Sequence, residues 1–547
     1  MTAPDLAEFA FTDVGPWVVD PDHLAWREHL PEIRAGAAHE AARLLVPRRI
    51  PPVGRGVRVL AGLARALVVW RLRERGTSRS RSGLARRLRL TFERLGSTYV
   101  KLGQIISAFE GLFPDDLVNE FKRLRDQVPP ERFADIRALV ERELDAPLSA
   151  VFAEFDEQPI AAASIAQVHA ARLVTGEDVV VKVQRPSVAA LVRADLRALA
   201  WIAPHLVGRI PVTALANPPA FVELFAEQVT EELDFRLEAE NMLDIARVLA
   251  STDQRTMVVP RPHPVLVTRR VLVMERLRGF AFDDVASMHE AGIDTGAVLR
   301  AGLIACLEGA MIHGVFHGDL HGGNLLVEAS GRTVLFDFGI TGRLSEPQRL
   351  AFLRLLLTGT SGDVKGQLAA LRDLGAFPFD TDLDAVFEDL ELDQPVKDPT
   401  QMSADELVSE LENLMTKLLG YGARAPKELM LFVKDLMYLN AATATLAPDL
   451  DLIAEIVHVH QYFLTTHGEQ LMREIGEAAL RPPDPDAIKA GFLVPPEVER
   501  LTFADLQERR RTILSRMGTK APGRGARIVR RRVPGPERPG PQGRERE

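Results

Sequence analysis

The sequence predicts an α+β fold with two lobes and helical additions at both ends, and three apolar patterns support this prediction. The β-branched run Val179–Val183 and the two strands read in Val265–Met274 indicate a sheet in the first lobe. Further along, Leu325–Glu328 and Val334–Phe336 form a hairpin pattern around Ala-Ser-Gly. With 547 residues and 46% hydrophobic content, the chain can bury a large core in one bilobal domain.

The polar residues around this hairpin indicate the chemistry. Residues 317–339 read HGDLHGGNLLVEASGRTVLFDFG, so Asn324 follows Asp319 by five residues and Asp337 opens a DFG triplet. A kinase fold uses this spacing for phosphoryl transfer, in which one Asp orients the attacking hydroxyl or water while an Asn and a second Asp hold magnesium. We therefore expect a protein-kinase-like fold with ATP and Mg²⁺ as cofactors, Asp319 as the catalytic residue, and Asn324 and Asp337 as metal ligands. The alternative is an ordinary hairpin with polar ends.

The catalytic loop departs from that of protein kinases at one position. Gly318 stands where the H-R-D motif has Arg, so activation by a phosphorylated loop that docks on this Arg is not expected. We interpret His317 and His321 as hydrogen-bonding residues that hold the loop and not as zinc ligands.

Lys182 lies in the middle of its β-branched run and is the expected contact to the nucleotide phosphates. A lysine in a buried strand needs an anionic partner, whereas an edge-strand lysine that prevents aggregation does not. The predicted helix Phe221–Asn241 supplies candidate carboxylates. Glu227 is the predicted partner of Lys182, with Glu223 and Glu231 one helical turn away as alternatives.

Two further segments complete the expected nucleotide site. Kinases offer backbone groups of the link between the lobes to adenine, which predicts contacts at Met274, Glu275 and Leu277. No G-x-G-x-x-G precedes the Lys182 strand, and no G-x-x-x-x-G-K-[ST] occurs. In the expected place of a glycine loop stand Ala161, Ala162, Ala163 and Ser164. Because alanine does not readily adopt a positive φ, this loop should wrap phosphates less closely than a glycine loop.

Taken together, these motifs resemble the UbiB-like (AarF-type) atypical kinases over roughly residues 90–450. The matching segments, in chain order, are YVKLGQIISAF, the alanine-rich loop followed by IAQVH, VVVKVQRP, EELDFRLEAEN, HGDLHGGN, the DFG triplet and PKELMLFVKDLMYLNAATATLAP at Pro426–Pro448. Gly322-Gly323 stands where the family usually has Pro-Gly. This difference loosens the backbone of the catalytic loop without removing Asp319 or Asn324.

The resemblance implies an N-terminal extension that folds over the active site. Its K-x-G-Q motif places Lys101 and Gln104 on one helical face. In the family, this motif acts together with the Glu-x-Asp pair, here Glu232 and Asp234, and is thought to block protein-sized substrates and to shape the nucleotide site. Residue chemistry alone would assign Lys101 and Gln104 to a solvated stripe on an apolar helix.

The domain organisation follows from the motifs and the composition. The predicted regions are a basic and helical N-terminal region at 1–89, the K-x-G-Q extension at 90–150, the N-lobe at 151–277, the C-lobe with helical additions at 278–480, and a C-terminal segment at 481–547 that ends in a basic disordered tail. A single cysteine, Cys306, excludes a disulfide framework and fits a reducing compartment.

Charge is unevenly distributed along the chain, whose net charge is −9. Residues 41–100 contain 15 Arg against Glu74 and Glu93, a local net charge of +13. Within them, Val57–Trp70 mixes apolar residues and arginines at helical spacing, which predicts either attachment to an anionic membrane surface or a core helix with exposed arginines. No aromatic-interleaved or helix-turn-helix pattern accompanies the arginines, so nucleic-acid binding is not expected.

Neither a signal peptide nor a transmembrane segment is evident in the sequence. We therefore expect a cytoplasmic protein whose peripheral attachment, if any, is to the inner face of the cell membrane. The sequence does not indicate an oligomeric state.

The predicted function is that of an atypical kinase-like enzyme, acting as an ATPase or as a kinase of a small molecule or lipid. The resemblance further implies support of isoprenoid-quinone or related lipid metabolism at membranes, with quinone-pathway proteins or lipids as partners. An aminoglycoside- or choline-type phosphotransferase is one alternative, because it shares H-G-D-x-x-x-x-N. A non-catalytic nucleotide-sensing scaffold is the other. The K-x-G-Q motif and the alanine-rich loop argue against the first alternative, and the complete set of catalytic side chains argues against the second.

Overall fold

The structure is a computed structural model that places two lobes around a central cavity. It describes residues 8–46, 54–73, 80–108, 115–124, 129–206, 218–252, 254–394, part of 402–424, 426–476, 481–495 and 497–518. The expected disordered tail from residue 521 lies outside the described residues.

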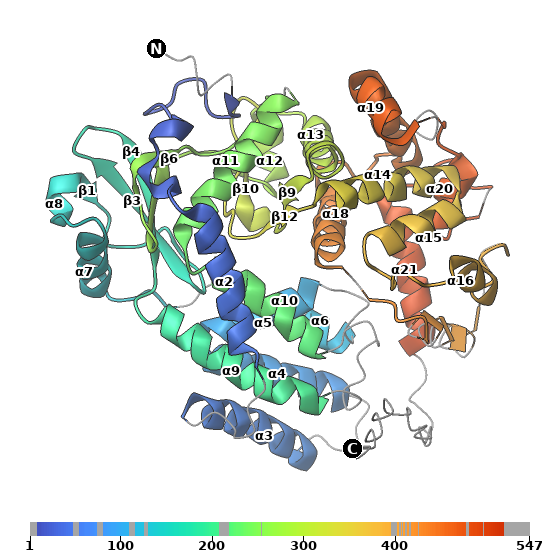
Figure 1. Cartoon of the computed structure of the whole chain (residues 1–547), viewed down its shortest axis with the longest axis horizontal. Coiled ribbons are helices and arrows are strands. Elements are labelled where there is room, and N and C mark those ends of the chain that lie inside the picture. Colours follow the sequence, from blue (N-terminus) through green and yellow to red (C-terminus); the bar gives the residue numbers. More distant parts are fainter. Residues whose placement is uncertain are drawn as a thin grey trace, which may run out of the picture.

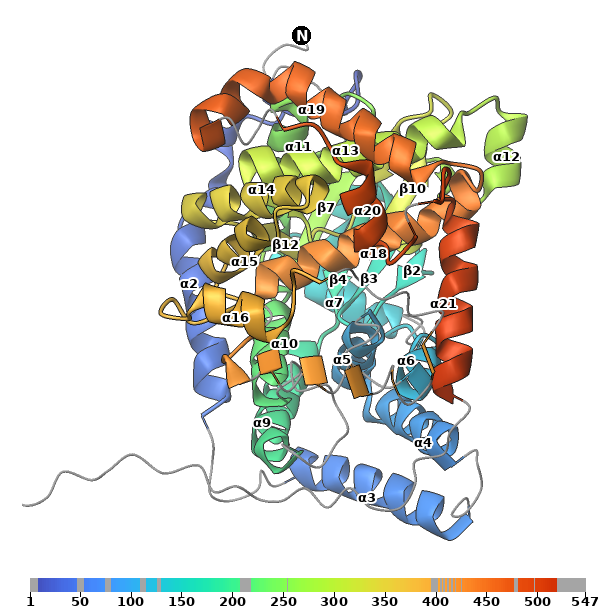
Figure 2. The same cartoon turned by 90° about the vertical axis from the view of Figure 1, so that its right-hand side faces the viewer.

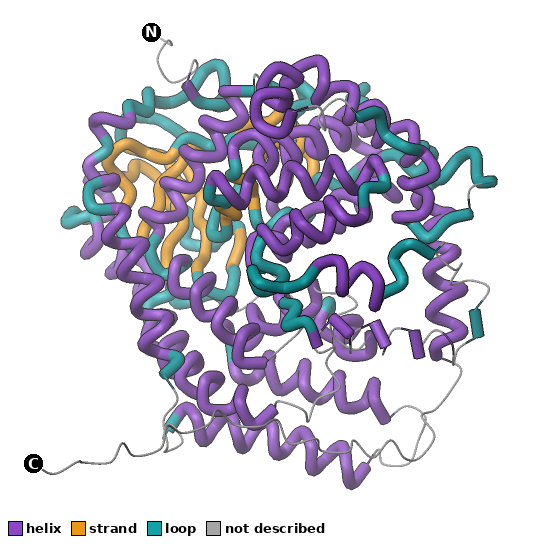
Figure 3. The backbone as a smooth tube through the Cα atoms, turned by 45° about the vertical axis from the view of Figure 1, so that its right-hand side comes forward, coloured by secondary structure: helices purple, strands orange, loops and turns teal. Residues whose placement is uncertain are grey.

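A six-stranded antiparallel sheet forms the smaller lobe (Figure 1, Figure 3). Its strands are β1 (Phe152–Phe155), β2 (Ala161–Ala162), β3 (Ala166–Leu173), β4 (Asp178–Gln184), β6 (Pro262–Val267) and β7 (Val271–Glu275), in the order β1-β3-β4-β7-β6 with β2 paired to β3. Val179, Val181 and Val183 are fully buried on the face that packs against α7 (Phe133–Glu143) and α8 (Leu148–Val151). Because successive side chains alternate between faces, Lys182 points to the other face of β4.

The chain between β4 and β5 forms α9 (Val188–Leu206), α10 (Pro218–Glu231) and α11 (Phe235–Ser251). Helix α11 packs against strands β6 and β7 of the sheet. The single helix predicted over Phe221–Asn241 is therefore wrong, because the chain turns between Glu231 and Phe235. Asp234 starts α11 by accepting a hydrogen bond from the backbone N–H of Arg236.

The larger lobe is mainly helical. Its helices are α12 (Val285–Glu290), α13 (Thr295–Glu308), which continues as the short π-helix η3 (Gly309–His313), α14 (Glu346–Ser361), α15 (Val364–Asp373), α16 (Leu383–Asp389), α18 (Lys427–Leu446), α19 (Leu452–Ile475), α20 (Pro485–Gly491) and α21 (Phe503–Gly518). Its short strands are β5 (Met257–Val258), β8 (Phe280–Ala281), β9 (Val315–His317), β10 (Leu325–Val327), β11 (Thr333–Leu335) and β12 (Thr341–Arg343), and the 3-10 turn η4 is Gly322–Asn324. β10 and β11 pair antiparallel, which confirms the predicted hairpin.

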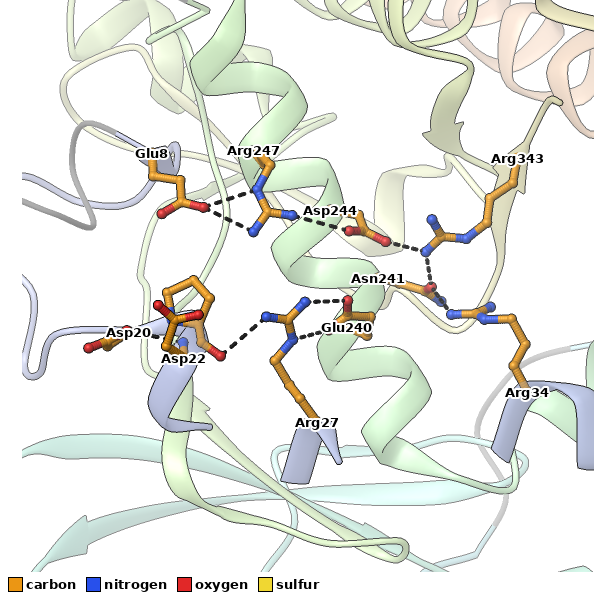
Figure 4. A network of polar contacts seen from close by, with 11 residues as sticks. Glu8, Asp20, Asp22, Arg27, Arg34, Glu240, Asn241, Asp244, Arg247 and Arg343 are labelled. Atoms are coloured by element: carbon orange, nitrogen blue, oxygen red, sulfur yellow. Dashed lines mark hydrogen bonds and ion pairs between the residues drawn. The ribbon is translucent and has the colours of Figure 1, made fainter. Parts of the chain in front are cut away.

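The N-terminal segment packs into the core cluster that contains residues of both lobes. It contains the 3-10 turns η1 (Pro21–His23) and η2 (Ala25–Arg27) and the helix α2 (Leu30–Leu44). Phe9 and Phe11 are buried in the main core cluster together with residues of α11 and the larger lobe. Arg27 forms a bidentate ion pair with Glu240 of α11, with both N–O distances at 2.9 Å (Figure 4). This segment is thus part of the bilobal core.

Four helices form a separate layer at the lower edge of the molecule (Figure 2). They are α3 (Arg55–Arg73), α4 (Ser80–Leu95), α5 (Ser97–Ala108) and α6 (Asp115–Phe121). Their apolar side chains pack with α9 and α10 in a second core cluster that is distinct from the main one. The K-x-G-Q helix α5 therefore belongs to a hydrophobic cluster that is separate from the main core.

Two described helical segments, Thr295–His313 and Lys427–Leu446, are long and apolar enough to cross a membrane by length and composition. The two segments pack against each other, and both contribute side chains to the main core cluster. Core helices of folded domains meet the same criterion, so these segments are weak indications of a span.

Candidate active site

A cavity of about 830 Å³ lies between the lobes and collects nearly all of the predicted site residues. Those that line it are Lys101, Gln104, Ala161, Ala162, Ala163, Ser164, Lys182, Glu232, Met274, Glu275, Leu277, Asp319, Asn324 and Asp337. Glu227 and Asp234 are the two predicted residues that do not.

Lys182 joins the sheet to α11 and to the DFG triplet. Its Nζ lies 2.6 Å from Glu238 Oε1 and 3.0 Å from Asp337 Oδ1. Burial disfavours the charged lysine, but the two carboxylates outweigh it and raise the pKa of Lys182. Burial raises the pKa of Glu238, and Lys182 opposes that shift. The ammonium group is therefore held charged at the centre of the cavity.

The predicted pairing of Lys182 with Glu227 is wrong. Glu227 lies on α10 and its carboxylate contacts Lys427 of α18 at 3.3 Å. The reason is the turn that separates α10 from α11, because helical spacing counted from Glu227 does not continue across it. Asp234, an N-cap residue before an apolar run, was the available signal that a new helix starts there and that Glu238 lies in its first turn.

Asp234 does not shape the cavity directly. Its carboxylate caps α11 and pairs with Arg236 at 2.7 Å. In the Glu-x-Asp pair, Glu232 therefore reaches the cavity, while Asp234 holds the start of the helix that carries Glu238.

Asp319 and Asn324 are oriented by the loop that contains them. The side-chain amide of Asn324 donates to the backbone carbonyl of Asp319 at 3.0 Å. His317 Nδ1 accepts a hydrogen bond from the Asp319 N–H at 3.2 Å, and His321 Nδ1 accepts one from Gly323 N–H at 3.1 Å. Burial lowers the pKa of His317 to about 4, so its ring is a neutral acceptor. Both histidines thus hold the loop by hydrogen bonds, as the sequence predicts.

Asp337 adopts a backbone conformation that is uncommon outside glycine. Its φ is +64°, in the left-handed region where Asp and Asn occur more often than other side chains. Burial would raise its pKa, but Lys182 and Lys101 outweigh this effect and lower it. An ionised carboxylate whose side chain is 45% exposed to the cavity, at a strained backbone position, fits the predicted role of a metal ligand.

The K-x-G-Q helix α5 places its lysine over the cavity. Lys101 Nζ lies 2.6 Å from Glu232 Oε1, and both side chains are mostly buried. Burial raises the pKa of Glu232 to about 7 against the opposing effect of Lys101. The amide of Gln104 faces the same cavity and donates to the carbonyl of Leu124 at 3.4 Å. The motif thus forms one wall of the site.

The alanine-rich loop is a short hairpin between β2 and β3 that is held by hydrogen bonds to the backbone of Ala163. Ala163 N–H donates to the Ala166 carbonyl at 2.9 Å, and no described residue between 161 and 164 has a positive φ. Arg185, which follows the lysine strand, donates to the Ala163 carbonyl at 3.0 Å. Alanine is therefore compatible with this backbone, which leaves no need for glycine.

At the link between the lobes, Glu275 turns its side chain away from the cavity. Its carboxylate accepts a hydrogen bond from the Thr12 hydroxyl at 2.6 Å, and Arg261 lies 3.5 Å away. A contact to nucleotide at this position would be made by backbone groups, as the sequence predicts.

Two cavity neighbours were missed at the sequence level. Lys434 of α18 contacts the carboxylate of Asp319, and Asp435 accepts a hydrogen bond from the Leu320 N–H at 2.9 Å. The available signal was an adjacent Lys-Asp pair in the otherwise apolar stretch LMLFVKDLMYL.

Comparison with known proteins gives the family. Residues 123–370 match the profile described as ABC1 atypical kinase-like domain. A protein of Mycobacterium tuberculosis strain H37Rv, Uncharacterized protein Rv0647c, is 36% identical over 67% of this chain and 75% of its own length. A Probable protein kinase UbiB of Marinobacter nauticus is 32% identical over 67% of each chain. The chain belongs to the ABC1 family of atypical kinase-like proteins.

A plant protein and a solved structure are also similar to this chain. An aarF domain-containing protein kinase of Arabidopsis thaliana, At5g05200, is 34% identical over 67% of this chain and 73% of its own length. Among solved structures, the complex of Rv3197 with erythromycin from Mycobacterium tuberculosis aligns over 63% of this chain and 91% of that chain, with a TM-score of 0.36 and 21% identity.

The ABC1 match contains only part of the cavity. Lys182, Asp319 and Asp337 lie inside the matched range, whereas Lys101 and Lys434 lie before and after it. In this ABC1 protein, helices α5 and α18, which lie outside the matched range, therefore contribute to the wall of the cavity.

Proposed function

We propose that this ABC1 protein is an ATP- and Mg²⁺-dependent phosphoryl-transfer enzyme, acting as an ATPase or as a kinase of a small molecule or lipid, that supports isoprenoid-quinone or related lipid metabolism at a membrane surface. The observation that carries the proposal is the convergence of Lys182, Glu238 and Asp337 with Asp319 and Asn324 around one cavity.

The donor groups of the cavity fit a magnesium nucleotide. Within the described residues, no group of three or more His, Cys, Asp and Glu side chains could hold a metal alone. Mg²⁺ is usually bound by one or two carboxylates together with substrate phosphates. Asp337 and Asn324 offer such oxygen ligands, and Lys182 and Lys101 offer positive charge to phosphates. Bound MgATP would supply the transferable phosphoryl group and a metal that neutralises its charge.

Each polar side chain of the cavity has its own role in the proposed phosphoryl transfer. Asp319 is ionised, since the charge of Lys434 outweighs the effect of burial and lowers the pKa of the carboxylate. It is thus able to orient an attacking hydroxyl or water and to accept its proton. Glu238 keeps Lys182 in place, and Asn324 holds the backbone of Asp319.

The cover over the cavity supports a small acceptor. Residues of α5 and of the segment after α6, among them Lys101, Gln104 and Leu124, line the cavity. A folded protein substrate would have to displace these helices to reach Asp319, whereas water or a small molecule would not. Two relatives named Probable protein kinase UbiB, together with the family resemblance, favour an acceptor or effector in quinone metabolism.

The outer face of α3 supports the membrane part of the proposal. Its inner residues Val59 and Ala66 are buried, whereas Val57, Val68 and Leu72 are 58%, 54% and 78% exposed. The exposed apolar positions recur at helical spacing, and α3 carries arginines but no Asp or Glu. Helix α3 lies at the edge of the molecule (Figure 2). Exposed apolar residues together with arginines on such a helix suit an anionic lipid surface.

Phosphate release from MgATP tests the enzymatic part. We expect turnover by the wild-type protein and a loss of about 100-fold or more in Asp337→Asn, since this variant removes charge from the metal site. Asp384→Asn is a matched control, because Asp384 is exposed on α16 and lies outside the cavity. Nucleotide binding without turnover above the Asp337→Asn background would refute the enzymatic proposal. Phosphorylation of an aminoglycoside or choline would replace it by the phosphotransferase alternative.

Sedimentation with lipid vesicles tests the membrane part. We expect binding to vesicles that contain an anionic lipid, and loss of this binding in the double variant Val68→Asp/Leu72→Asp. Val265→Asp is the control, because Val265 is 71% exposed on strand β6 of the smaller lobe. Equal binding by all three proteins would exclude α3 as the membrane surface. Vesicles that raise phosphate release only in the proteins that bind would link the two activities.

A further inference from the structure

Helix α18 contacts the catalytic loop through three side chains on one face. Lys434 contacts the Asp319 carboxylate, and Asp435 accepts a hydrogen bond from the Leu320 N–H at 2.9 Å. A Cβ atom at Gly322 would lie 3.3 Å from the hydroxyl of Tyr438, so this ring also packs on the loop. Tyr438 is four residues after Lys434 and three after Asp435, so it neighbours both side chains on the helix surface. A helix more than 100 residues downstream thus braces the loop that carries the predicted catalytic residue.

The contact between Lys434 and Asp319 differs from the other ion pairs of the cavity. Lys182 is bound to Glu238 and Asp337, and Lys101 is bound to Glu232. Lys434 instead contacts the carboxylate of Asp319, the predicted catalytic residue.

The catalytic loop itself contains no lysine or arginine between its Asp and its Asn. Leu320, His321, Gly322 and Gly323 are the residues between Asp319 and Asn324, and none of them is Lys or Arg. The Lys434 side chain is 16% exposed and lines the cavity, so its ammonium group lies at the reacting end of the site and not on the outer surface.

We propose that Lys434 is a positioning residue for phosphoryl transfer, which holds the Asp319 carboxylate towards the acceptor and offsets the negative charge at the acceptor end of the cavity. This inference rests on the proposed function. In the reaction, the acceptor oxygen bonds to phosphorus as the bond from phosphorus to the nucleoside diphosphate breaks, and the acceptor proton passes to Asp319. Lys434 stays protonated throughout, so its contribution is geometry and charge.

Turnover of Lys434 variants provides the first test. Lys434→Met should lower kcat by roughly 100-fold, because the carboxylate loses its orientation. KM should change much less, and Lys434→Arg should restore part of kcat because it keeps the charge. Lys427→Met is the matched control, since Lys427 lies on the same helix and contacts Glu227 outside the cavity. A kcat within twofold of wild type in Lys434→Met, or no recovery in Lys434→Arg together with a lowered Tm, would overturn the inference.

A binding cycle tests the same contact without turnover. In Lys434→Met, the uncompensated Asp319 carboxylate should repel the terminal phosphate, so ATP should bind about fivefold or more weakly while ADP binding changes less. In Lys434→Met/Asp319→Asn, this selective loss should disappear. An equal loss for both nucleotides, or no recovery in the double variant, would contradict the positioning role. A wild-type protein without turnover would refute the proposed function, and this cycle would still decide whether Lys434 neutralises Asp319.

Discussion

Two lysine–glutamate pairs face the same cavity at the same distance, but the structure supports them differently. Lys182 pairs with Glu238 and Lys101 pairs with Glu232, each at 2.6 Å. Glu238 lies on α11, whose apolar side belongs to the main core cluster. Lys101 and Glu232 connect α5 to the end of α10, and both helices pack in the second cluster. The cavity thus has a frame and a cover with separate hydrophobic cores.

The frame is reinforced by polar contacts on the outer side of α11 (Figure 4). Arg27, Arg34 and Glu8 of the N-terminal segment contact Glu240, Asn241 and Arg247 of α11, and Arg343 of β12 contacts Asp244. The same Asn241 side chain donates to the Phe338 carbonyl of the DFG triplet at 2.8 Å. One helix therefore connects the N-terminal segment, Lys182 and the DFG triplet. The ion pair Lys182–Glu238 thus belongs to the frame, whereas the ion pair Lys101–Glu232 belongs to the separately packed cover.

The largest effect is expected when the frame pair is broken. Lys182→Met removes the charge at the centre of the cavity, so the buried Glu238 loses its cation and Asp337 loses its contact with Lys182. We expect phosphate release to fall by about 100-fold or more, and the free energy of unfolding to fall by about 3 kcal/mol. Phosphate release and urea unfolding measure the two effects. The distinction between frame and cover would be wrong if Lys101→Met lowered both quantities by as much.

A smaller effect is expected when the outer support of α11 is removed. Arg27→Ala eliminates the bidentate contact with Glu240 and should lower the free energy of unfolding by about 1 to 2 kcal/mol. Arg132→Ala is the control, because Arg132 pairs with Asp135 through a similar contact but its side chain is 83% exposed. This control should leave the unfolding free energy nearly unchanged, because solvent screens the exposed pair. Equal losses in both variants would show that the N-terminal segment does not reinforce α11.

The cover pair should give the protein a pH dependence. Burial raises the pKa of Glu232 from its unfolded value of 4.5 to about 7, so the folded state binds its proton more tightly than the unfolded state. Its contribution to stability is therefore greatest below pH 4.5 and is lost as the pH rises towards 7. Glu232→Gln should flatten the unfolding free energy against pH in this window by at most about 1.4 kcal/mol per pH unit. An unchanged slope in urea unfolding between pH 5 and pH 7 would show that Glu232 is ionised throughout.

The smallest effect is expected at the alanine-rich loop, where the frame and the cover meet. Ala163→Gly keeps the hydrogen bonds of Ala163 to Ala166 and Arg185 but adds backbone freedom in the unfolded chain. The unfolding free energy should fall by about 0.5 to 1 kcal/mol. Nucleotide affinity, measured by titration, should change as well, because the loop gains access to positive φ. A loss of stability above 2 kcal/mol would mean that the alanine side chain itself supports the cover.

The sheet strands, the hairpin and most side chains that line the cavity could be predicted from the sequence. Val179–Val183 is a strand because its β-branched residues alternate around a buried face, and the hairpin of β10 and β11 follows from local turn chemistry. Asp319, Asn324 and Asp337 meet in one cavity since short strands fix the distance between them. Such patterns can be read from the chain because the contacts that they specify are close in sequence.

Only the tertiary structure decided which side chains pair across the cavity. Glu238 replaced Glu227 as the partner of Lys182 because the turn before α11 resets the helical face, and Lys434 reaches Asp319 from a helix more than 100 residues away. The exposure of one face of α3 also depends on α4 and α9, which cover the other face. Ion pairs and exposed faces arise from how whole elements pack, and the spacing of residues along one element does not contain that information.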